Sequence, residues 1–563
     1  MDEFPATDSL RENFARNVCC VPAGAQSEPK SIREPAMKML HSSIELLEAR
    51  IAPATLVGNV LTYTDLDGDL VKVTFTNATV APFNITFSTG MANDGVDTPR
   101  SLDQIDLTGQ TGGGFTLTAT PHDGKGDSHA NVGTILCTSS TALGNVKVDG
   151  DVQGITGFSN APVSVASFSA LSMGASNQPG TTAHSYLASA GTFSVKGSVS
   201  GVALDFTGGV SSVSIGGNLG AATDATSLHV SGTVGSFKVG GSIIGKGTDK
   251  TVSVGGAVGA FSVGGSIFGG PDDLSPGAFQ IDLASAKSIT VGGDLRGGKG
   301  LGGGSINVAG GTVATVKIGG SMVAAAAVDG SGTFFGANVG SFTLGHDLVT
   351  DLFGSSSARN GTIYLTGNLG SLKIGGDIIS VPSSGSFTPA TIVADGTIGT
   401  VSVGGSILGD PSHPIYILAG GVGAAQGAPA IKSITVRHNV ELARIVAGYG
   451  GTGQSFTPHN TDAGIGSINI GGNLTGTQID VGSTAGSDNI PGTANDLVIG
   501  ASLARIDSIK IGGALTGISG DSTTYYVQAP VIKKATIGKA SYGPIHGNVE
   551  FNSIGKAAIS ALP

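Results

Sequence analysis

The sequence predicts an all-β protein, a parallel β-solenoid of about eleven coils with an N-terminal β cap domain. Three observations lead to this prediction: Gly makes up 94 of the 563 residues, only 12% of the residues are charged, and one Gly-Gly unit recurs along most of the chain. Average proteins contain about 7% Gly and about 25% charged residues. A fixed recurring unit in such a composition is typical of repeat architectures.

The recurring unit is an apolar residue, a small polar or Lys residue, Val or Ile, Gly-Gly, a short polar residue, and Ile or Leu. Successive copies begin 24 to 41 residues apart. The apolar residues alternate with a polar one, so one face of a short strand points to a core. Clear copies occupy residues 213–219, 237–243, 261–267, 289–295, 316–322, 372–378, 401–407, 468–474 and 509–515, and degenerate copies occupy 342–348 and 434–440.

Strands this short cannot form a core alone, but coils stacked about 4.8 Å apart would bond each strand to its copies above and below. Eleven coils would give a rod about 50 Å long. The Gly-Gly pairs are expected to turn the chain at corners, with Gly375 or Gly376 at positive φ. Helix is disfavoured, because each Gly pair would cost a helix about 2 kcal/mol.

Composition also excludes several classes of protein. The hydrophobic share of 39% argues against disorder, and Gly occurs without the G-X-Y period of collagen. A net charge of -11 argues against a nucleic-acid partner, and no apolar run reaches the length of a transmembrane helix. Cys19 and Cys20 are adjacent and Cys137 is remote, so no disulfide framework is expected.

The chain is expected to have four segments: a disordered leader at 1–42, a short motif at 43–55, a small β domain or cap at 56–145, and the Gly-rich solenoid at 146–563. Residues 43–54 are expected to form one or two helical turns that end at Pro53. In the third segment, strands at 60–64 and 70–75 are expected to form a hairpin. Further strands are expected at 83–88, 102–107 and 115–120.

The motif LEARIAP at residues 47–53 resembles the N-terminal motif of large repeat-rich proteins of planctomycete and verrucomicrobial bacteria, which are thought to be secreted or surface-exposed. Residues 133–151 resemble the same family where its repeats begin. The resemblance implies a location outside the cell rather than an activity. In that family the motif lies near the start of the chain, so Met37 and Met39 are alternative starts to Met1.

Asp65, Asp67 and Asp69 place three carboxylates at alternate positions, which could surround a Ca²⁺ ion. The spacing departs from an EF-hand, because Gly68 is fourth in the loop and Thr76 stands where the twelfth-position Glu is expected. The interpretation that the sequence favours is a hairpin turn, and calcium is the alternative.

Residues 122–129 bring His122, Asp123, Asp127 and His129 together as an alternative transition-metal site, for which a polar loop is the simpler explanation. The middle residues of the repeat strands are polar or Lys, from Ser214 and Lys238 onward. They indicate a solvated outer face rather than a ligand-binding stripe.

The function expected from these features is a secreted or cell-surface structural or adhesive protein without catalysis. Its expected partners are cell-surface components or extracellular polysaccharide. The alternative is a polysaccharide lyase or glycoside hydrolase of the β-helix type, which needs converging acids. The densest acids of the repeat segment are Asp272 and Asp273 with Asp282, and Asp347 with Asp351, on separate coils. Three or more charged side chains in one groove would favour the enzyme.

Overall fold

The computed structural model describes residues 53–561 except 94–97, 123, 125, 138–141, 176–181, 246–250, 270–279, 299–302, 325–331, 351–360, 382–391, 453–454, 494, 500–502, 520–523, 546 and 553–555. The leader, the LEARIAP motif and the expected helical turns lie outside these residues. Residues 51–563 form one compact unit, separate from residues 1–50.

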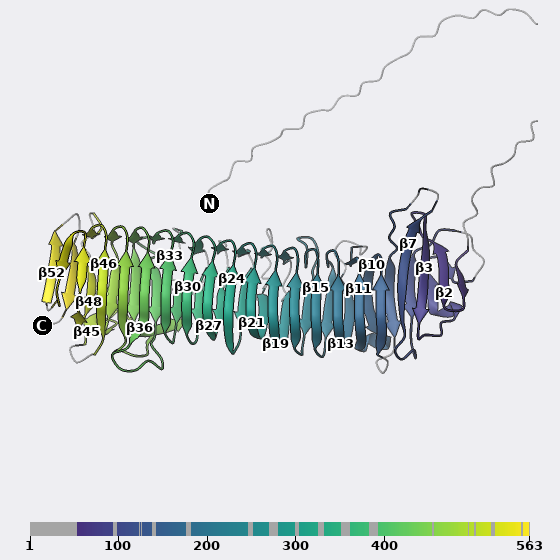
Figure 1. Ribbon diagram of the computed structural model, residues 1–563, viewed down its shortest axis with the longest axis horizontal. Helices are drawn as coiled ribbons and strands as arrows, with labels where there is room; N and C mark the ends of the chain where they lie inside the picture. Colours follow the sequence, from purple (N-terminus) through teal and green to yellow (C-terminus); the bar gives the residue numbers. More distant parts are fainter. Residues whose placement is uncertain are drawn as a thin grey trace, which may run out of the picture. The chain divides into compact units, whose positions relative to one another are not determined.

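The described residues are all-β with many parallel strands, as the sequence predicts (Figure 1). Their helical segments are two single 3-10 turns, η1 (Pro82–Asn84) and η2 (Phe158–Asn160). No helix among them is long and apolar enough to span a membrane.

The Gly-Gly strands form a first ladder, in which each strand pairs in parallel with its counterpart in the next repeat. We call residues 143–537 the parallel stack. The ladder extends beyond the eleven predicted copies at both ends. Its strands are β9 (Leu143–Val148), β11 (Val163–Ala170), β13 (Ala183–Val195), β15 (Val210–Ile215), β17 (Val234–Val239), β19 (Val252–Val263), β21 (Gln280–Val291), β24 (Thr312–Ile318), β27 (Asn338–Leu344), β30 (Leu369–Ile374), β33 (Ile398–Val403), β36 (Pro429–Val436), β41 (Gly464–Ile470), β46 (Arg505–Ile511) and β50 (Ala535–Ile537).

The apolar residue at the end of each repeat unit starts a second parallel ladder. Its strands are β18 (Ile243–Ile244), β20 (Ile267–Phe268), β22 (Leu295–Arg296), β25 (Met322–Val323), β28 (Leu348–Thr350), β31 (Ile378–Ser380), β34 (Ile407–Leu408), β37 (Val440–Glu441), β42 (Leu474–Thr475) and β47 (Leu515–Thr516). Single parallel bridges continue it upstream from Ile243 to Met173.

A third ladder, which runs through parts of β13, β19 and β21, precedes the Gly-Gly strands in each repeat. Its other strands are β14 (Val202–Phe206), β16 (Ser227–Val230), β23 (Ser305–Val308), β26 (Phe334–Gly336), β29 (Ile363–Leu365), β32 (Ile392–Ala394), β35 (Ile415–Ala419), β38 (Ala443–Ala447), β43 (Gln478–Val481) and β48 (Thr524–Ala529).

The register places the same unit position of every repeat in one row. Ser214 pairs with Lys238, and Lys238 pairs with Ser262. These side chains are exposed or half-buried, whereas Val213 and Ile215 on either side of Ser214 are fully buried. The predicted alternation of inward apolar and outward polar residues is therefore confirmed. The apolar residues form one cluster that runs from Ala54 to Ile545.

The prediction that Gly375 or Gly376 has a positive φ is wrong, because neither residue lies in the left-handed region. Close approach between repeats explains the glycines instead. A Cβ on Gly375 would lie 2.0 Å from the carbonyl oxygen of Gly345, and a Cβ on Gly376 would lie 1.9 Å from Asp347 Oδ1. The Gly-Gly pair thus leaves room for the preceding repeat.

The short polar residues after the Gly-Gly corners form what we call the polar column. In two runs, the side-chain oxygen of a member accepts a hydrogen bond from the backbone N–H of the next residue in the run, at 2.6 to 3.2 Å. The first run is Asn218, Ser242, Ser266, Asp294, Ser321, Asp347, Asp377 and Ser406, and the second is Asn439 and Asn473, which ends at the backbone N–H of Ala514.

Residues 53–137, which we call the N-terminal region, begin as an antiparallel sheet. In it β1 (Thr55–Val57) pairs with β2 (Val60–Thr64), β2 with β3 (Asp69–Thr76), and β3 with β7 (Gly114–Pro121). The expected hairpin and the expected strands near 83–88, 102–107 and 115–120 are present. A six-stranded sheet contains β12 (Ser172–Met173), β10 (Asp151–Gly157), β8 (Val132–Cys137), β6 (Leu102–Asp106), β4 (Ile85–Phe87) and β5 (Gly90–Met91).

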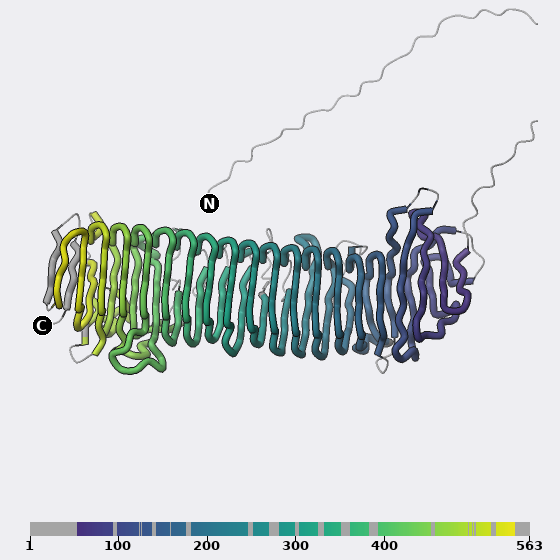
Figure 2. The backbone as a smooth tube through the Cα atoms, viewed as in Figure 1, coloured from purple at the N-terminus to yellow at the C-terminus, as the bar shows by residue number. Residues whose placement is uncertain are grey.

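The N-terminal region continues directly into the parallel stack, because β7 pairs in parallel with β9, and β8 with β10 (Figure 2). The boundary expected between residues 145 and 146 therefore lies within β9. At the C-terminal end the pairing is again antiparallel, between β50 and β51 (Ala540–Tyr542) and between β52 (Gly547–Asn552) and β53 (Lys556–Ala561). The short β49 (Val531–Ile532) pairs in parallel with β46.

Candidate cation site

The Asp-rich segment between β2 and β3 is a tight hairpin turn. Asp65 Oδ1 accepts the backbone N–H groups of Gly68 at 3.1 Å and of Asp69 at 2.8 Å. The antiparallel pairing of β2 with β3 starts next to the turn, where Thr64 pairs with Leu70. The turn that the sequence favours is confirmed, and it accounts for one oxygen of Asp65.

The loop between β7 and β8 packs onto this turn. Asp69 Oδ2 accepts the backbone N–H groups of Asp127 at 3.1 Å and of His129 at 3.2 Å. A Cβ on Gly126 would lie 2.0 Å from Asp69 Oδ1, so the backbone of the loop can approach the Asp69 carboxylate this closely only at a glycine. The two segments for which the sequence suggested separate metal sites therefore meet at Asp69. Asp123 lies outside the described residues.

The carboxylates of Asp65, Asp67 and Asp69 can each place an oxygen within 4.8 Å of the others. Asp67 is exposed, whereas Asp65 is 8% exposed and Asp69 is fully buried. Burial, a hydrogen bond with Asp67 and the charges of Asp67 and Asp69 raise the pKa of Asp65 to about 7, although the backbone hydrogen bond from Asp69 opposes this. The crowded carboxyl groups thus favour a proton or a cation among them.

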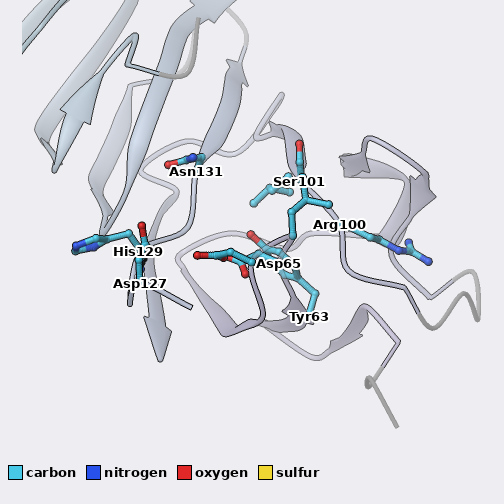
Figure 3. Close-up of a pocket in the computed structure, with 10 residues that line it drawn as sticks. Tyr63, Asp65, Arg100, Ser101, Asp127, His129 and Asn131 are labelled. Atoms are coloured by element: carbon cyan, nitrogen blue, oxygen red, sulfur yellow. Dashed lines mark hydrogen bonds between the residues drawn. The ribbon is translucent and has the colours of Figure 1, made fainter. Parts of the chain in front are cut away.

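A pocket of about 210 Å³ opens beside the turn (Figure 3). The Tyr63 hydroxyl is buried and has no hydrogen-bond partner in the part of the chain that the structure describes, and burial next to Asp65 raises the pKa of Tyr63. Arg100 donates to Met91 O at 3.1 Å, and its guanidinium lies 5.5 Å from the Phe87 ring centre. The lining residues are Tyr63, Asp65, Leu66, Asp67, Arg100, Ser101, Leu102, Asp127, His129 and Asn131.

The close spacing favours cation binding over acid–base catalysis. Glycoside hydrolysis uses two carboxyl groups about 5 to 9.5 Å apart, with room for a sugar or a water between them. The three carboxylates here are closer together and offer several oxygens around one point, which is the ligand type that Ca²⁺ prefers. His122 is not among the residues that line the pocket.

A second cluster, which the sequence analysis missed, lies on the outward face of the third ladder. We call it the outer cluster, and it is separate from the main core. The sequence does contain a pattern that indicates this cluster. Segments such as 415–419 are apolar at every position, which is typical of strands buried on both faces. Its members are Tyr364, Val393, Tyr416, Leu418, Val446 and Tyr449, with Phe335, Phe456, Ala485 and Ile490 packed against them.

Two inserted hairpins contribute to the outer cluster, β39 (Tyr449–Thr452) with β40 (Ser455–Pro458), and β44 (Ser483–Thr484) with β45 (Leu497–Val498). The Phe456 ring stacks on Tyr416 with centres 5.3 Å apart. The Tyr449 hydroxyl accepts the backbone N–H of Ala485 at 2.6 Å. These contacts show that the insertions pack over the strands.

Polar groups at the outer cluster are largely paired with one another. The Tyr364 hydroxyl donates to Asp395 Oδ2 at 3.0 Å, and His459 Nε2 lies 3.7 Å from Asp395 Oδ1. Arg444 donates to the Tyr416 hydroxyl and its guanidinium lies over the Tyr416 ring. This pairing is typical of a packed interface between a sheet and its insertions.

Asp480 on β43 is 1% exposed, and neither of its carboxylate oxygens makes a well-formed hydrogen bond among the described residues. Burial, followed by the neighbouring Asp496, raises the pKa of Asp480 well above its ordinary value. Asp496 accepts the backbone N–H of Gly492 at 2.6 Å. Asp480 is thus held as a neutral acid at pH values where an exposed Asp is charged.

Of the acids that the sequence suggested for an enzyme of the repeat segment, the structure describes Asp282 and Asp347, which belong to different repeats. Asp347 belongs to the polar column, and Asp282 accepts a hydrogen bond from Asn307 at 3.2 Å. Asp272, Asp273 and Asp351 lie outside the described residues.

Comparisons with known proteins found no match for this chain among family models, curated proteins or solved structures.

Proposed function

We propose that the chain is a parallel β-solenoid that acts as a structural or adhesive protein, secreted or displayed at the cell surface, without catalytic activity. The observation that carries this proposal is the continuous parallel pairing of the first ladder from β9 to β50. At about 4.8 Å per strand, these fifteen strands would extend about 70 Å. A long continuous ladder suits a spacer that holds other segments away from a surface.

The polar column supports the same proposal. It adds a side-chain hydrogen bond between neighbouring repeats at a position where the backbones already bond. Along each bonded run of the polar column, a repeat is therefore tied to the next by two kinds of hydrogen bond and by the shared apolar core. Such coupling between nearest neighbours is the source of stability in repeat proteins.

The row of Ser, Thr, Asn and Lys on the outward face of the first ladder supports an exposed, hydrated location. Lys238, Lys317 and Lys373 are exposed members of this row. Outward charges of this kind hinder unwanted association of sheets. The partners we propose are cell-surface components or extracellular polysaccharide.

The alternative function, a polysaccharide lyase or glycoside hydrolase, is favoured by one observation. Asp65, Asp67, Asp127 and Arg100 line one pocket, so charged side chains do converge. The site lies in the N-terminal region rather than along the stack. The close spacing of three carboxylates and the engagement of Arg100 with Met91 and Phe87 make it poorly suited to acid–base catalysis.

The two functions can be separated by one set of experiments. Protease treatment and antibody labelling of intact producing cells should detect the chain at the surface. The purified chain should then bind cell envelopes or acidic polysaccharide without releasing reducing ends or unsaturated sugars. Release of either product, abolished by Asp67→Asn, would replace the structural proposal with the enzyme.

A further inference from the structure

We propose that the turn at Asp65–Asp69 binds Ca²⁺, and that the ion fastens the loop of residues 126–129 to the β2–β3 hairpin. The ligand oxygens would come from Asp65, Asp67 and Asp69. This inference concerns the N-terminal region alone and does not depend on the proposed function.

The first argument is an oxygen that the hydrogen bonds leave unpaired. The turn occupies Asp65 Oδ1, and the loop N–H groups occupy Asp69 Oδ2. Asp69 Oδ1 is fully buried and has no donor among the described residues. A buried carboxylate oxygen without a partner is costly, and a cation would remove that cost.

The second argument is independent of the carboxylates. The Tyr63 hydroxyl lines the same pocket, its residue is 1% exposed, and it has no hydrogen-bond partner among the described residues. In Figure 3, Tyr63 and Asp65 lie next to each other. A polar group buried at this place indicates a hydrated or ion-filled pocket rather than an apolar one.

The third argument is charge. Asp65, Asp67 and Asp127 line the pocket, and the only Lys or Arg among the lining residues is Arg100, which is directed to Met91 O and the Phe87 ring. In Figure 3 the Arg100 side chain points away from Asp65. Ca²⁺ fits this site better than Mg²⁺, because it accepts six to eight oxygens in irregular geometry, whereas Mg²⁺ demands a near-ideal octahedron.

The expected consequence is mechanical. Asp69 would bind the ion through Oδ1 while Oδ2 holds the N–H groups of Asp127 and His129. The loop lies just before β8, whose partner β10 starts in the first repeats of the stack. Calcium would therefore stiffen the junction between the hairpin and the parallel strands.

The test uses the full chain. Calcium chloride added after chelation should raise the melting temperature of the N-terminal region by several degrees, through ligand linkage. Tb³⁺ replaces Ca²⁺ at oxygen sites and luminesces when a nearby tyrosine transfers excitation energy to it. Bound Tb³⁺ should therefore luminesce when tyrosine is excited, with Tyr63 as the energy donor. Tyr63→Phe should remove most of this luminescence and keep the calcium-dependent melting shift.

Asp67→Asn is the key variant, because Asp67 is exposed and its change leaves the fold intact. It should weaken calcium and Tb³⁺ binding by about tenfold or more. The matched control is Asp488→Asn, which changes another exposed Asp, one that accepts the backbone N–H of Ile490 at 3.0 Å. Unchanged melting and no luminescence in the unmodified chain would overturn the proposal, as would equal calcium responses in the two Asn variants.

Discussion

The N-terminal region and the parallel stack share one apolar core, yet they satisfy their buried polar groups in opposite ways. In the stack, Asp347 and Asp377 each accept a backbone N–H from the following repeat. In the N-terminal region, Asp65 accepts N–H groups from its own turn and Asp69 accepts them from one distant loop, while Asp69 Oδ1 has no hydrogen-bond donor among the residues described. At the polar column the repeated register supplies an N–H donor for each of these Asp side chains, whereas the single irregular turn leaves one carboxylate oxygen without a donor among the described residues.

The largest expected effect concerns the junction of the two regions. Deleting residues 1–142 leaves β9 intact but removes β7, which pairs with β9, and β8, which pairs with β10. The deletion therefore exposes the unpaired edges of two strands. We expect aggregates or fibres by light scattering. Deletion of residues 1–36 is the control and should change nothing. A monodisperse, folded product of the larger deletion would make the N-terminal region an independent module.

Gly376→Val tests the corners of the stack. Its side chain would displace Asp347 Oδ1 from the backbone N–H of Asp377, and we expect a loss of about 2–3 kcal/mol. The outward Lys373→Ser should cost less than about 0.5 kcal/mol. Both are measured by chemical denaturation.

A double-mutant cycle separates close approach from backbone strain at the same corner. Asp347→Ala removes the oxygen that a Cβ on residue 376 would meet, so the effects of Asp347→Ala and Gly376→Val should be less than additive. Strict additivity would mean that the valine acts through the backbone conformation instead.

Asp480→Asn tests a buried acid of the stack that has an acidic neighbour rather than an N–H donor. The raised pKa means that the folded chain keeps a proton that the unfolded chain releases above about pH 4, so stability falls as the pH rises. Other ionisable groups near it are Asp496, Tyr449 and, on the adjacent strand β38, Arg444.

The neutral Asn should therefore stabilise the protein at pH 8 and have little effect at pH 4. Each unit by which the pKa is raised corresponds to about 1.4 kcal/mol. Thermal melts across this range check the prediction, and a benefit that is equal at both pH values would contradict the protonated state of Asp480.

Asp377→Ala should cost about 1 kcal/mol, less than Gly376→Val, because it removes one acceptor of the polar column. Asp377→Asn keeps an acceptor oxygen and should recover most of that loss. Hydrogen exchange at the amide of Ser406 is the direct measurement. If the Asn variant exchanges as fast as the Ala variant, the negative charge matters more than the hydrogen bond.

The sequence predicted the repeated part of the molecule well, because each copy of the unit confirms the others. The prediction of a positive φ near Gly376 was wrong, because a single sequence does not distinguish a Gly that avoids contact with the neighbouring repeat from a Gly that adopts a positive φ. The sequence treated Asp69 and His129 as unrelated, because 60 residues separate two groups that one hydrogen bond joins. The outer cluster depends on where the insertions fold back, which the repeat pattern does not encode.

The polar column also bears on how such a chain changes over evolutionary time. Within each bonded run of the polar column, an inner member such as Asp377 donates to the repeat before it and accepts from the repeat after it. A duplicated repeat would find the same partners on both sides, and a lost repeat would leave none unmatched. The gene can therefore lengthen or shorten the protein in whole steps of one unit, while the two irregular ends are inherited unchanged.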